Sequence, residues 1–333
     1  MNNRLKIDFV IPWVDGSDPE WIADKNKYLD EEDKISAADN RFRDWGIMKY
    51  WFRGVEKYAP WVNHIYFITW GHIPEWLNTD NPKLTIVRHE YYIPKEYLPT
   101  FSSHPIELNM HRITGLEEHF VYFNDDMFLT DYVKEEDFFE NGLPKDMAIP
   151  DVLSTGDYND AFVHFLLNDS AIINKYFQKH KVMKKFRNKF YNLKYKKNLL
   201  KTLLLTPFNR FSLFYIRHLP QAFLKSTFES VWNKEYDILN EVSKHKFRNY
   251  KDLNQHLMIW WQLCEGKFVP MKETGKYYDL RNKFDYSIIY ERKYKYICLN
   301  DTSENINFED EKIRIQAAFE KALPEKSSFE KQK

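Results

Sequence analysis

Two adjacent carboxylates, Asp125 and Asp126, stand where an apolar run, residues 120–123, abruptly ends. Asn124 precedes them, and apolar residues resume directly after them in the letters MFL. This return favours a partly enclosed cleft over a solvated turn. Carboxylate oxygens are the ligands that Mg²⁺ and Mn²⁺ prefer, and these ions readily take further ligands from phosphate oxygens. We therefore interpret residues 124–126 as a divalent-cation site facing a diphosphate, as in nucleotide-sugar enzymes.

A second apolar run, in the letters YICLNDT, ends in the same way with Asn300 and Asp301. If the two strand ends lie side by side, their oxygens complete one cation site. Asn-Asp-Thr also forms ordinary turns, so the spacing leaves both alternatives open.

Asp15, Ser17 and Asp18 follow the first apolar run in a cluster of turn-forming residues. They suit contacts with the ribose or base of a nucleotide, and equally they suit capping of the next helix. Arg43 and Asp44 precede a helical pattern further along. Asp44 is well placed as a helix N-cap, whereas the free N–H groups of a helix start, together with Arg43, would also suit a phosphate.

Glu107, His111 and Arg112 lie close together in the letters HPIELNMHRITG. Glu107 and His111 are four residues apart and share one face of a predicted helix. Such a pair could orient a catalytic imidazole for work on a bound substrate. A local surface interaction is the alternative that spacing alone favours.

These residues lie at the ends of predicted strands and helices. Short apolar, β-rich runs bounded by turn formers predict strands, and apolar residues at helical spacing predict helices. Their alternation predicts an α/β fold with a mostly parallel sheet and ligands at the carboxyl edge of its strands. The predicted strands are residues 6–14, 63–71, 83–93, 120–126 and 294–301, and the predicted helices are 43–61, 106–119 and the second half of 219–263.

Residues 179–217 carry many lysines and arginines and no acid, with Phe, Tyr and Leu interleaved at roughly helical spacing. A solvated face is the ordinary explanation of a charge run, but the interleaved apolar residues favour an anionic membrane surface or a polyanionic substrate. No recognised motif supports binding of nucleic acid. We interpret 165–217 as a basic, aromatic helical insertion and the polar tail 324–333 as disordered.

The composition of the 333 residues narrows the class of protein. Lys and Arg together number 49, as do Asp and Glu, so net charge points to no class of partner. Cys264 and Cys298 are too few for a disulfide framework, which suits a reducing cytosol. The sequence shows neither a membrane-spanning stretch nor a glycine-rich nucleotide fingerprint. We expect a soluble cytoplasmic protein, or one peripheral at the inner face of the plasma membrane.

Several segments, taken together, resemble the four blocks of the Stealth proteins in order. They are IDFVIPWVDGSDPEW, residues 43–129 with APWV, IPEWLN, LPTFSSHPIE, HRI and NDD, then RHLPQAFLKSTFESVW, then YICLNDT. The resemblance covers about half the chain directly. Stealth proteins are hexose-1-phosphoryltransferases, among them bacterial capsular-polysaccharide phosphotransferases and the animal enzyme that adds N-acetylglucosamine-1-phosphate to lysosomal glycoproteins. The resemblance implies one catalytic domain over 1–323, with a Rossmann-like, GT-A-like nucleotide-sugar transferase fold.

The resemblance also implies a reaction and roles for particular residues. An acceptor hydroxyl attacks the sugar-proximal phosphorus of a UDP-sugar, and UMP leaves. By match to the family, Asp15 and Asp18 would hold the nucleotide, and Asp44 corresponds to an essential acid. His218 corresponds to a catalytic histidine and Arg248 to an arginine that faces the phosphate. The third block matches more loosely than the others, which weakens the roles of His218 and Arg248.

These residue types fit the chemistry. Attack on a diphosphate requires charge neutralisation, in-line positioning and a base for the incoming hydroxyl. The carboxylates supply ligands for Mg²⁺ or Mn²⁺, and Arg248 stabilises charge on phosphoryl oxygens. His218 is the candidate base because an imidazole titrates near neutrality, with His111 in reserve.

The expected partners are therefore a UDP-sugar donor and a glycan or polysaccharide acceptor, with no nucleic acid. Two alternatives stay open. One is an ordinary glycosyltransferase that uses the same donor and cation but releases UDP. The other is a non-catalytic scaffold that binds a polyanion or a membrane.

Overall fold

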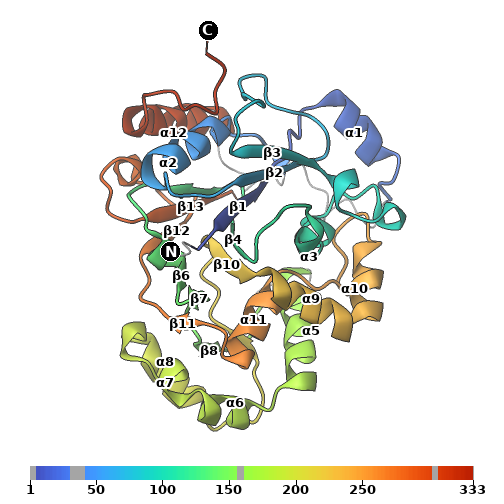
Figure 1. The fold of residues 1–333 in the computed structure, drawn as a ribbon, viewed down its shortest axis with the longest axis vertical. Helices are drawn as coiled ribbons and strands as arrows, with labels where there is room; N and C mark the ends of the chain where they lie inside the picture. Colours follow the sequence, from blue (N-terminus) through green and yellow to red (C-terminus); the bar gives the residue numbers. More distant parts are fainter. Residues whose placement is uncertain (1–4, 31–41, 156–160, 302–306, 333) are drawn as a thin grey trace.

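The computed structural model describes residues 5–30, 42–155, 161–301 and 307–332. A five-stranded sheet runs through the middle of the molecule in the order β10-β4-β1-β2-β3 (Figure 1). Its first four strands along the chain are parallel, and β10 pairs antiparallel with β4. The predicted α/β fold with a mostly parallel sheet is thus confirmed. The five strands are β1 Ile7–Pro12, β2 Ile65–Thr69, β3 Leu84–Arg88, β4 His119–Tyr122 and β10 Gln221–Leu224.

Smaller sheets flank this central one. The strands of the three-stranded sheet that bears on the site are β12 Gly275–Asp279, β13 Tyr296–Asn300 and β5 Met127–Leu129. The remaining strands are β11 Val269–Pro270, β7 Leu143–Asp146 and β6 Phe139–Glu140 in one sheet, and β8 Pro150–Asp151 with β9 Leu213–Phe214 in another.

Helices are spread along the whole chain. The α-helices are α1 Pro19–Asn26, α2 Met48–Tyr58, α3 Ser103–Leu108, α4 Glu135–Phe138, α5 Ala161–Tyr176, α6 Lys179–Lys185, α7 Arg187–Phe190, α8 Asn198–Leu205, α9 Lys225–Lys234, α10 Tyr236–Ser243, α11 His256–Glu265 and α12 Phe308–Ala322. The 3₁₀ turns are His89–Tyr91, Lys95–Tyr97, Met110–Arg112, Leu193–Tyr195 and Tyr286–Ile289. In the described residues, no helix combines the length and the apolar character that crossing a bilayer requires.

The central sheet is buried on both faces. Phe9 and Ile11 of β1 face one core, which α2 and α12 complete, whereas Val10 faces the other core, with α3, α9 and α11. Successive side chains of a strand point to opposite faces, so a strand covered on both sides is mostly apolar. This explains why the parallel strands were visible in the sequence as largely apolar runs, although β1 also contains the buried Asp8.

The order of the strands creates a crevice. β1 has β2 on one side and β4 on the other, so the connections leave β1 in opposite directions. Ligands of open α/β sheets bind at such a switch point, beyond the carboxyl ends of the strands. Trp13 follows β1 there and Asn124 follows β4, so the fold itself places the acidic turn at a binding position.

Two predicted helices are shorter than the sequence suggested. The helix predicted at 43–61 begins only at Met48, with Ile47 at its N-cap. The helix predicted at 106–119 ends at Leu108 and gives way to a 3₁₀ turn. Asn109 ends it, because its side chain donates to the Pro105 carbonyl at 2.8 Å and accepts from Arg112 at 2.9 Å. Glu107 and His111 therefore do not share a helix face.

The prediction of a disordered tail is wrong for residues 324–332, and residue 333 lies outside the described part. Phe329 is 3% exposed and packs into the core on the α2 face. Glu330 accepts from Arg53 of α2 through both oxygens, at 2.8 Å and 2.9 Å. The mostly polar composition of the tail gave no indication that these two residues attach it to the rest of the fold. The helical character predicted for 179–205 is observed, while its status as an insertion stays a prediction.

We expect Glu330→Gln to destabilise the fold by about 1–3 kcal/mol at pH 7, because it leaves the buried Arg53 guanidinium with the exposed Glu320 as its remaining charge partner. Burial opposes ionisation of Glu330, but Arg53 outweighs it and lowers the pKa of this carboxyl below 4.5. The stabilisation is therefore present above pH 4.5 and is lost as the pH falls through the lowered pKa. Urea denaturation of both proteins across this range measures the difference.

Glu325→Gln is the matched control, because Glu325 is exposed in the same tail. It should unfold like the parent chain. Equal stability of the Glu330 variant and the control at pH 7 would show that the tail contributes nothing to the fold.

Candidate active site

A cleft of about 1020 Å³ opens at the carboxyl ends of β1 and β4. It gathers ten of the residues singled out in the sequence, from segments far apart along the chain. They are Arg43, Asp44, Glu107, Asn124, Asp125, Asp126, His218, Arg248, Asn300 and Asp301.

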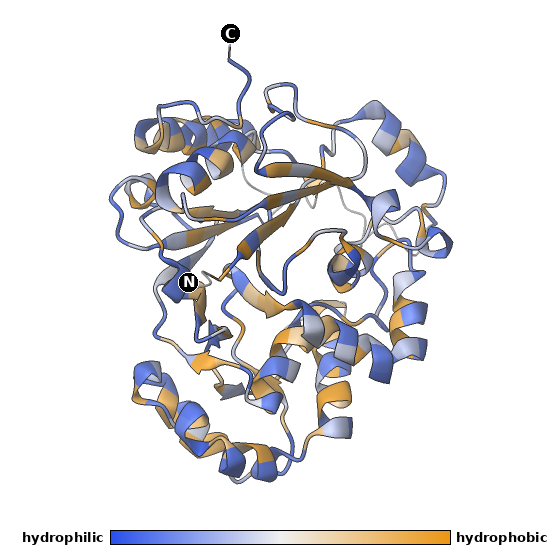
Figure 2. Cartoon of the chain, viewed as in Figure 1, coloured by the Kyte–Doolittle hydropathy of each residue, from blue (hydrophilic) through white to orange (hydrophobic). Residues whose placement is uncertain are grey.

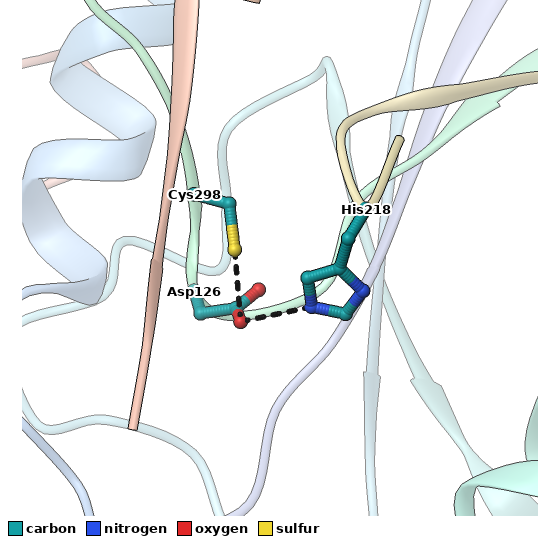
Figure 3. Close-up of side chains that lie close together, drawn as sticks. All are labelled: Asp126, His218 and Cys298. Atoms are coloured by element: carbon teal, nitrogen blue, oxygen red, sulfur yellow. Dashed lines mark hydrogen bonds and ion pairs between the residues drawn. The ribbon is translucent and has the colours of Figure 1, made fainter. Parts of the chain in front are cut away.

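Asp126 is the centre of a hydrogen-bonded cluster (Figure 3). Its Oδ2 accepts from the Cys298 thiol at 3.2 Å and lies 3.3 Å from Nε2 of His218. The Asn300 amide nitrogen lies 3.1 Å from the same Nε2. Nε2 thus has an acceptor and a donor beside it. Protonated, it donates to Asp126, and neutral, it accepts from Asn300, so both protonation states are satisfied.

The strands fix this cluster. Directly after the acidic turn, β5 pairs antiparallel with β13, and Met127 lies opposite Cys298. The backbone carbonyl of Asp126 accepts from the Leu299 N–H at 2.9 Å. The pairing therefore brings the side chains of Cys298 and Asn300 to the side of Asp126.

His218 enters the cluster from the segment before β10 with a left-handed backbone, at φ 46°. This conformation is strained for most residues that carry a Cβ, and such residues concentrate at functional sites. The Tyr277 ring meets the imidazole edge-on at 5.6 Å. Burial alone would lower the pKa of His218, but the hydrogen bond and charge of Asp126 outweigh it and raise the pKa above 6.5.

The second side of the cleft carries an acid and an arginine. Glu107 is buried and accepts from the Tyr122 hydroxyl at 2.9 Å, and burial raises its pKa to about 7. Arg248 donates to the Ser103 hydroxyl at 3.1 Å. Burial of its guanidinium lowers the pKa, partly offset by the charge of Glu107. These groups line the same cleft as the acidic turn, so an anion bound in the cleft could meet Arg248.

The donor set fits a divalent cation. The other oxygen of Asp126, Oδ1, is buried and has no hydrogen-bond partner among the described residues. The enclosing cleft walls, and then the charge of Asp126, raise the pKa of Asp125 to about 7. A bound cation would relieve both features. Cys298 is a poor ligand by comparison, because burial holds the pKa of its thiol well above the ordinary value and keeps it protonated.

Asp301 and Asp44 make contacts that were not predicted from the sequence. Asp301 pairs with Arg43 at 3.9 Å. Asp44 is not a helix N-cap, because its carboxylate accepts from the Gly46 N–H at 2.9 Å in a turn before α2. Gly46 has a φ of 64°, which suits glycine. Asp44 nevertheless lines the cleft, and its charge adds to the raised pKa of Asp125.

His111 and Arg112 are not among the described residues that line the cleft, and their roles in catalysis and substrate binding stay predictions. His111 packs against Phe228 and Trp232, and burial lowers its pKa to about 3. Arg112 stacks over the Trp232 ring at 4.7 Å. The reason is the early end of α3, which turns both side chains toward α9.

Asp15, Ser17 and Asp18 form the turn and cap that the sequence left open. Asp15 accepts from the Ser17 N–H at 2.9 Å, and Asp18 is the N-cap of α1, accepting from the N–H groups of Glu20 and Trp21. None of the three is among the residues that line the described cleft. Their contact with a nucleotide stays a prediction.

Sequence reasoning missed several residues that line the cleft. His104 is buried and its Nδ1 lies 2.7 Å from Asp252, which also meets His245 at 2.6 Å. His256 starts α11, and burial lowers its pKa to about 3, so it is neutral. Arg217 is held by Asp146 at 3.4 Å. A signal existed for two of them, because His104 lies in the segment LPTFSSHPIE and Arg217 adjoins His218.

An aromatic pocket of about 190 Å³ adjoins the cleft. It shares Asp125, Glu107 and Arg248 with the cleft. At one wall His89 is buried, and burial lowers its pKa to about 3. The Nδ1 of this neutral imidazole has no hydrogen-bond partner among the described residues. The aromatic side chains that line the pocket are Trp13, Trp21, Phe42, Trp70, Phe101 and Tyr122.

Fold and cleft together define an α/β enzyme whose site combines paired acids, an imidazole and an arginine, as group transfer on a charged substrate requires. Residues 5–33 match the family described as Stealth protein CR1, conserved region 1, and residues 41–146 match Stealth protein CR2, conserved region 2.

Relatives match almost the whole chain. A capsular polysaccharide phosphotransferase WcwK of Streptococcus pneumoniae is 46% identical over 99% of this chain and 100% of its own length. The exopolysaccharide phosphotransferase cps2G of Lactiplantibacillus plantarum is 41% identical over 98% of this chain and 96% of its own. The receptor polysaccharide phosphotransferase WefC of Streptococcus oralis is 41% identical over 98% and 99%. The chain therefore belongs to the Stealth family, and it is a phosphotransferase.

Proposed function

We propose that this enzyme transfers a sugar-1-phosphate from a UDP-sugar to a hydroxyl of a glycan acceptor in the synthesis of a capsular or other cell-surface polysaccharide, on the cytoplasmic side of the membrane. The observation that carries the proposal is the convergence of Asp125, Asp126, His218 and Arg248 in one cleft at the switch point of the sheet. The printed names of the relatives, which are polysaccharide phosphotransferases, support the acceptor class. The two cysteines are free and buried, as a reducing compartment allows.

The proposed reaction forms one bond at phosphorus and breaks another. The acceptor oxygen forms a bond to the sugar-bearing phosphorus of the donor, and the bond from that phosphorus to the bridging oxygen breaks. UMP leaves with the bridging oxygen, and the acceptor becomes a phosphodiester. The bond between the anomeric carbon of the sugar and its oxygen stays intact.

His218 is the base in this scheme. Its Nε2 receives the proton of the incoming hydroxyl, and the resulting imidazolium donates to Asp126, 3.3 Å away. Before the reaction, Asn300 donates to the same nitrogen of the neutral imidazole, at 3.1 Å, and the incoming hydroxyl takes its place as donor. The two partners let the proton arrive without leaving a buried polar group unsatisfied.

Arg248 and the acidic turn divide the work on the diphosphate. The guanidinium of Arg248, fixed through Ser103, donates to phosphoryl oxygens, where charge grows as UMP departs. Asp125 and Asp126 would hold Mg²⁺ or Mn²⁺, with Asn300 and Asp301 nearby on the cleft wall. A divalent ion there supplies charge neutralisation for the diphosphate.

The aromatic pocket suits the nucleobase of the donor. Flat rings stack on aromatic side chains, and the polar atoms of a uracil find a partner in the unpaired Nδ1 of His89. Because the pocket shares Asp125 and Arg248 with the cleft, a base seated in it places the diphosphate beside the acids. This arrangement favours a nucleotide donor.

We expect the purified chain, given a UDP-sugar, a glycan acceptor and Mg²⁺, to release UMP. Chromatographic separation of the nucleotides measures the product, because UMP and UDP differ by one phosphate. A screen of UDP-sugars identifies the sugar. Release of UDP in proportion to product would replace phosphoryl transfer with ordinary glycosyl transfer.

We expect His218→Asn to lower kcat by about 10²–10⁴-fold, the usual contribution of a general base. Asparagine tolerates the left-handed backbone at this position, so the loss reports chemistry and not misfolding. In the parent enzyme, activity should decline as the pH falls through the raised pKa of His218, because only the neutral imidazole accepts a proton.

The exposed histidine His180 supplies the matched control, and His180→Asn should leave kcat and the pH profile unchanged. Donor binding by the His218 variant, followed by calorimetry, should stay within a few-fold of the parent. Near-normal turnover of His218→Asn would assign the proton to another group.

We expect Asp126→Asn to weaken Mn²⁺ binding, because it removes the charge of the carboxylate whose Oδ1 has no protein partner. Electron paramagnetic resonance of free Mn²⁺, titrated with protein and without any substrate, measures the affinity directly. Asp24→Asn, an aspartate on α1 away from the cleft, is the control. Equal Mn²⁺ affinity of all three proteins would remove Asp126 from the cation site.

A further inference from the structure

Helix α8 exposes several of its apolar side chains to solvent. It is short, Asn198–Leu205, and its fully buried side chain is Thr202, at 0% exposed. Three of its five leucines are exposed, with Leu200 at 61%, Leu203 at 52% and Leu204 at 65%, while Leu199 and Leu205 are half-buried. A helix at the surface of a globular protein normally turns its apolar stripe inward. The exposed leucines leave an apolar stripe facing solvent.

The stripe continues beyond the helix. Leu193, in the preceding 3₁₀ turn, is 84% exposed, and Phe208, just after the helix, is 62% exposed. Leu200 and Leu204 are four residues apart and share one face of the helix, and Phe208 follows in the turn after it. Single exposed apolar residues are ordinary, but a contiguous group of large ones marks an interaction site.

Cations surround this stripe. Some lysines of the segment serve the fold: Lys179 donates to the Leu205 carbonyl at 2.5 Å, and Lys201 pairs with Asp151 at 2.7 Å. Residues 179–217 contain no acid. Within the described part of the chain, eight exposed cations of the segment have no acidic partner within ion-pair distance: Lys181, Lys184, Lys185, Arg187, Lys194, Lys196, Lys197 and Arg210.

Helices α6 to α8 form the lower rim of the molecule in the view of Figure 1. Figure 2 shows apolar and hydrophilic residues mixed along this rim. The chain then returns through β9 to residues 215–218, which line the cleft. The rim and the cleft wall are thus consecutive in the chain.

We propose that this rim, residues 179–210 with the stripe Leu193, Leu200, Leu203, Leu204 and Phe208, docks on an anionic lipid bilayer. The leucines enter the boundary between headgroups and acyl chains while the cations meet anionic headgroups. This is the pattern of an interfacial helix, with apolar residues on one face and lysines beside them.

Charge argues against a second copy of the chain as the occupant. A two-fold interface would bring the same patch of both subunits together and would set the unpaired cations against each other. A soluble polyanion would engage the cations but would give the leucines nothing to enter. A bilayer of anionic lipid satisfies both halves of the surface.

Docking would also present the cleft to acceptors carried by the membrane. This consequence rests on the proposed function, whereas the docking itself does not. Lipid binding can therefore be measured without any substrate, and its failure would leave the proposed reaction untouched.

The test is co-sedimentation of the full chain with lipid vesicles. We expect binding to vesicles of phosphatidylcholine mixed equally with phosphatidylglycerol, little binding to phosphatidylcholine alone, and weakening by salt. Leu200→Gln with Leu204→Gln should lower the partition coefficient by about 10-fold or more, since two apolar side chains no longer leave water. Lys196→Gln with Lys197→Gln should lower it by about 5-fold per charge.

Matched control variants distinguish lipid binding by this surface from non-specific binding of exposed apolar or basic residues elsewhere on the chain. Ile313→Gln removes an apolar side chain that is 63% exposed on α12, and Lys95→Gln with Lys293→Gln removes two exposed cations elsewhere. Both should bind vesicles like the parent. Circular dichroism and thermal unfolding confirm that all variants are folded.

Several outcomes would overturn the proposal. One is that the parent chain sediments with neither kind of vesicle. Another is that the lysine variant loses binding while the leucine variant keeps it, because a site for a polyanion would behave in this way. A parent chain that is dimeric by sedimentation velocity, with a monomeric leucine variant and no lipid binding, would assign the surface to self-association.

Discussion

The pairing of β5 with β13 is the constraint on which the site depends. It begins one residue after Asp126, so the acidic turn has no freedom to drift away from the sheet. The backbone bond from Leu299 to Asp126 closes this junction at 2.9 Å. A pairing formed by residues 167 to 171 positions apart thereby sets the surroundings of one carboxylate. Without it, Cys298 and Asn300 would have no fixed place beside the acids.

The site concentrates groups whose charges are costly to hold together. Asp125 and Glu107 both have a pKa of about 7, and His218 is kept in a left-handed backbone conformation. Surrounding structure must stabilise these features, and here the two buried cores on either side of the sheet provide it. Unfavourable local arrangements of this kind are common at active sites, where binding of a charged ligand relieves them.

Much of the fold could be predicted from the sequence, because burial on both faces makes a parallel strand largely apolar. β10 escaped prediction because four residues, Gln221–Leu224, lead directly into a helix and pair only with the distant β4. The smaller strands escaped for the same reason. Non-local pairing leaves little trace in a short stretch of sequence.

The candidate site was predicted where a residue type was unusual for its position, as with the acids after β4. It was missed or misplaced where the answer depended on how the chain turned. Glu107 and His111 were expected on one face of a continuous helix, which Asn109 ends. His104 was overlooked because its partner, Asp252, is 148 residues away. The tail was misread because one phenylalanine and one glutamate carry its packing.

The shared wall between the cleft and the aromatic pocket has a consequence for inhibitors. Trp13, Asn124, Asp125 and Arg248 line both spaces, so a compound with one group in each space would contact the same four side chains from both sides. A flat ring joined by a short link to a group that carries a metal-binding oxygen would occupy both at once. Tethering the two fragments raises the effective concentration of the second near its site, so affinity grows without new contacts. The wall thus offers a route to selective ligands from two individually weak fragments.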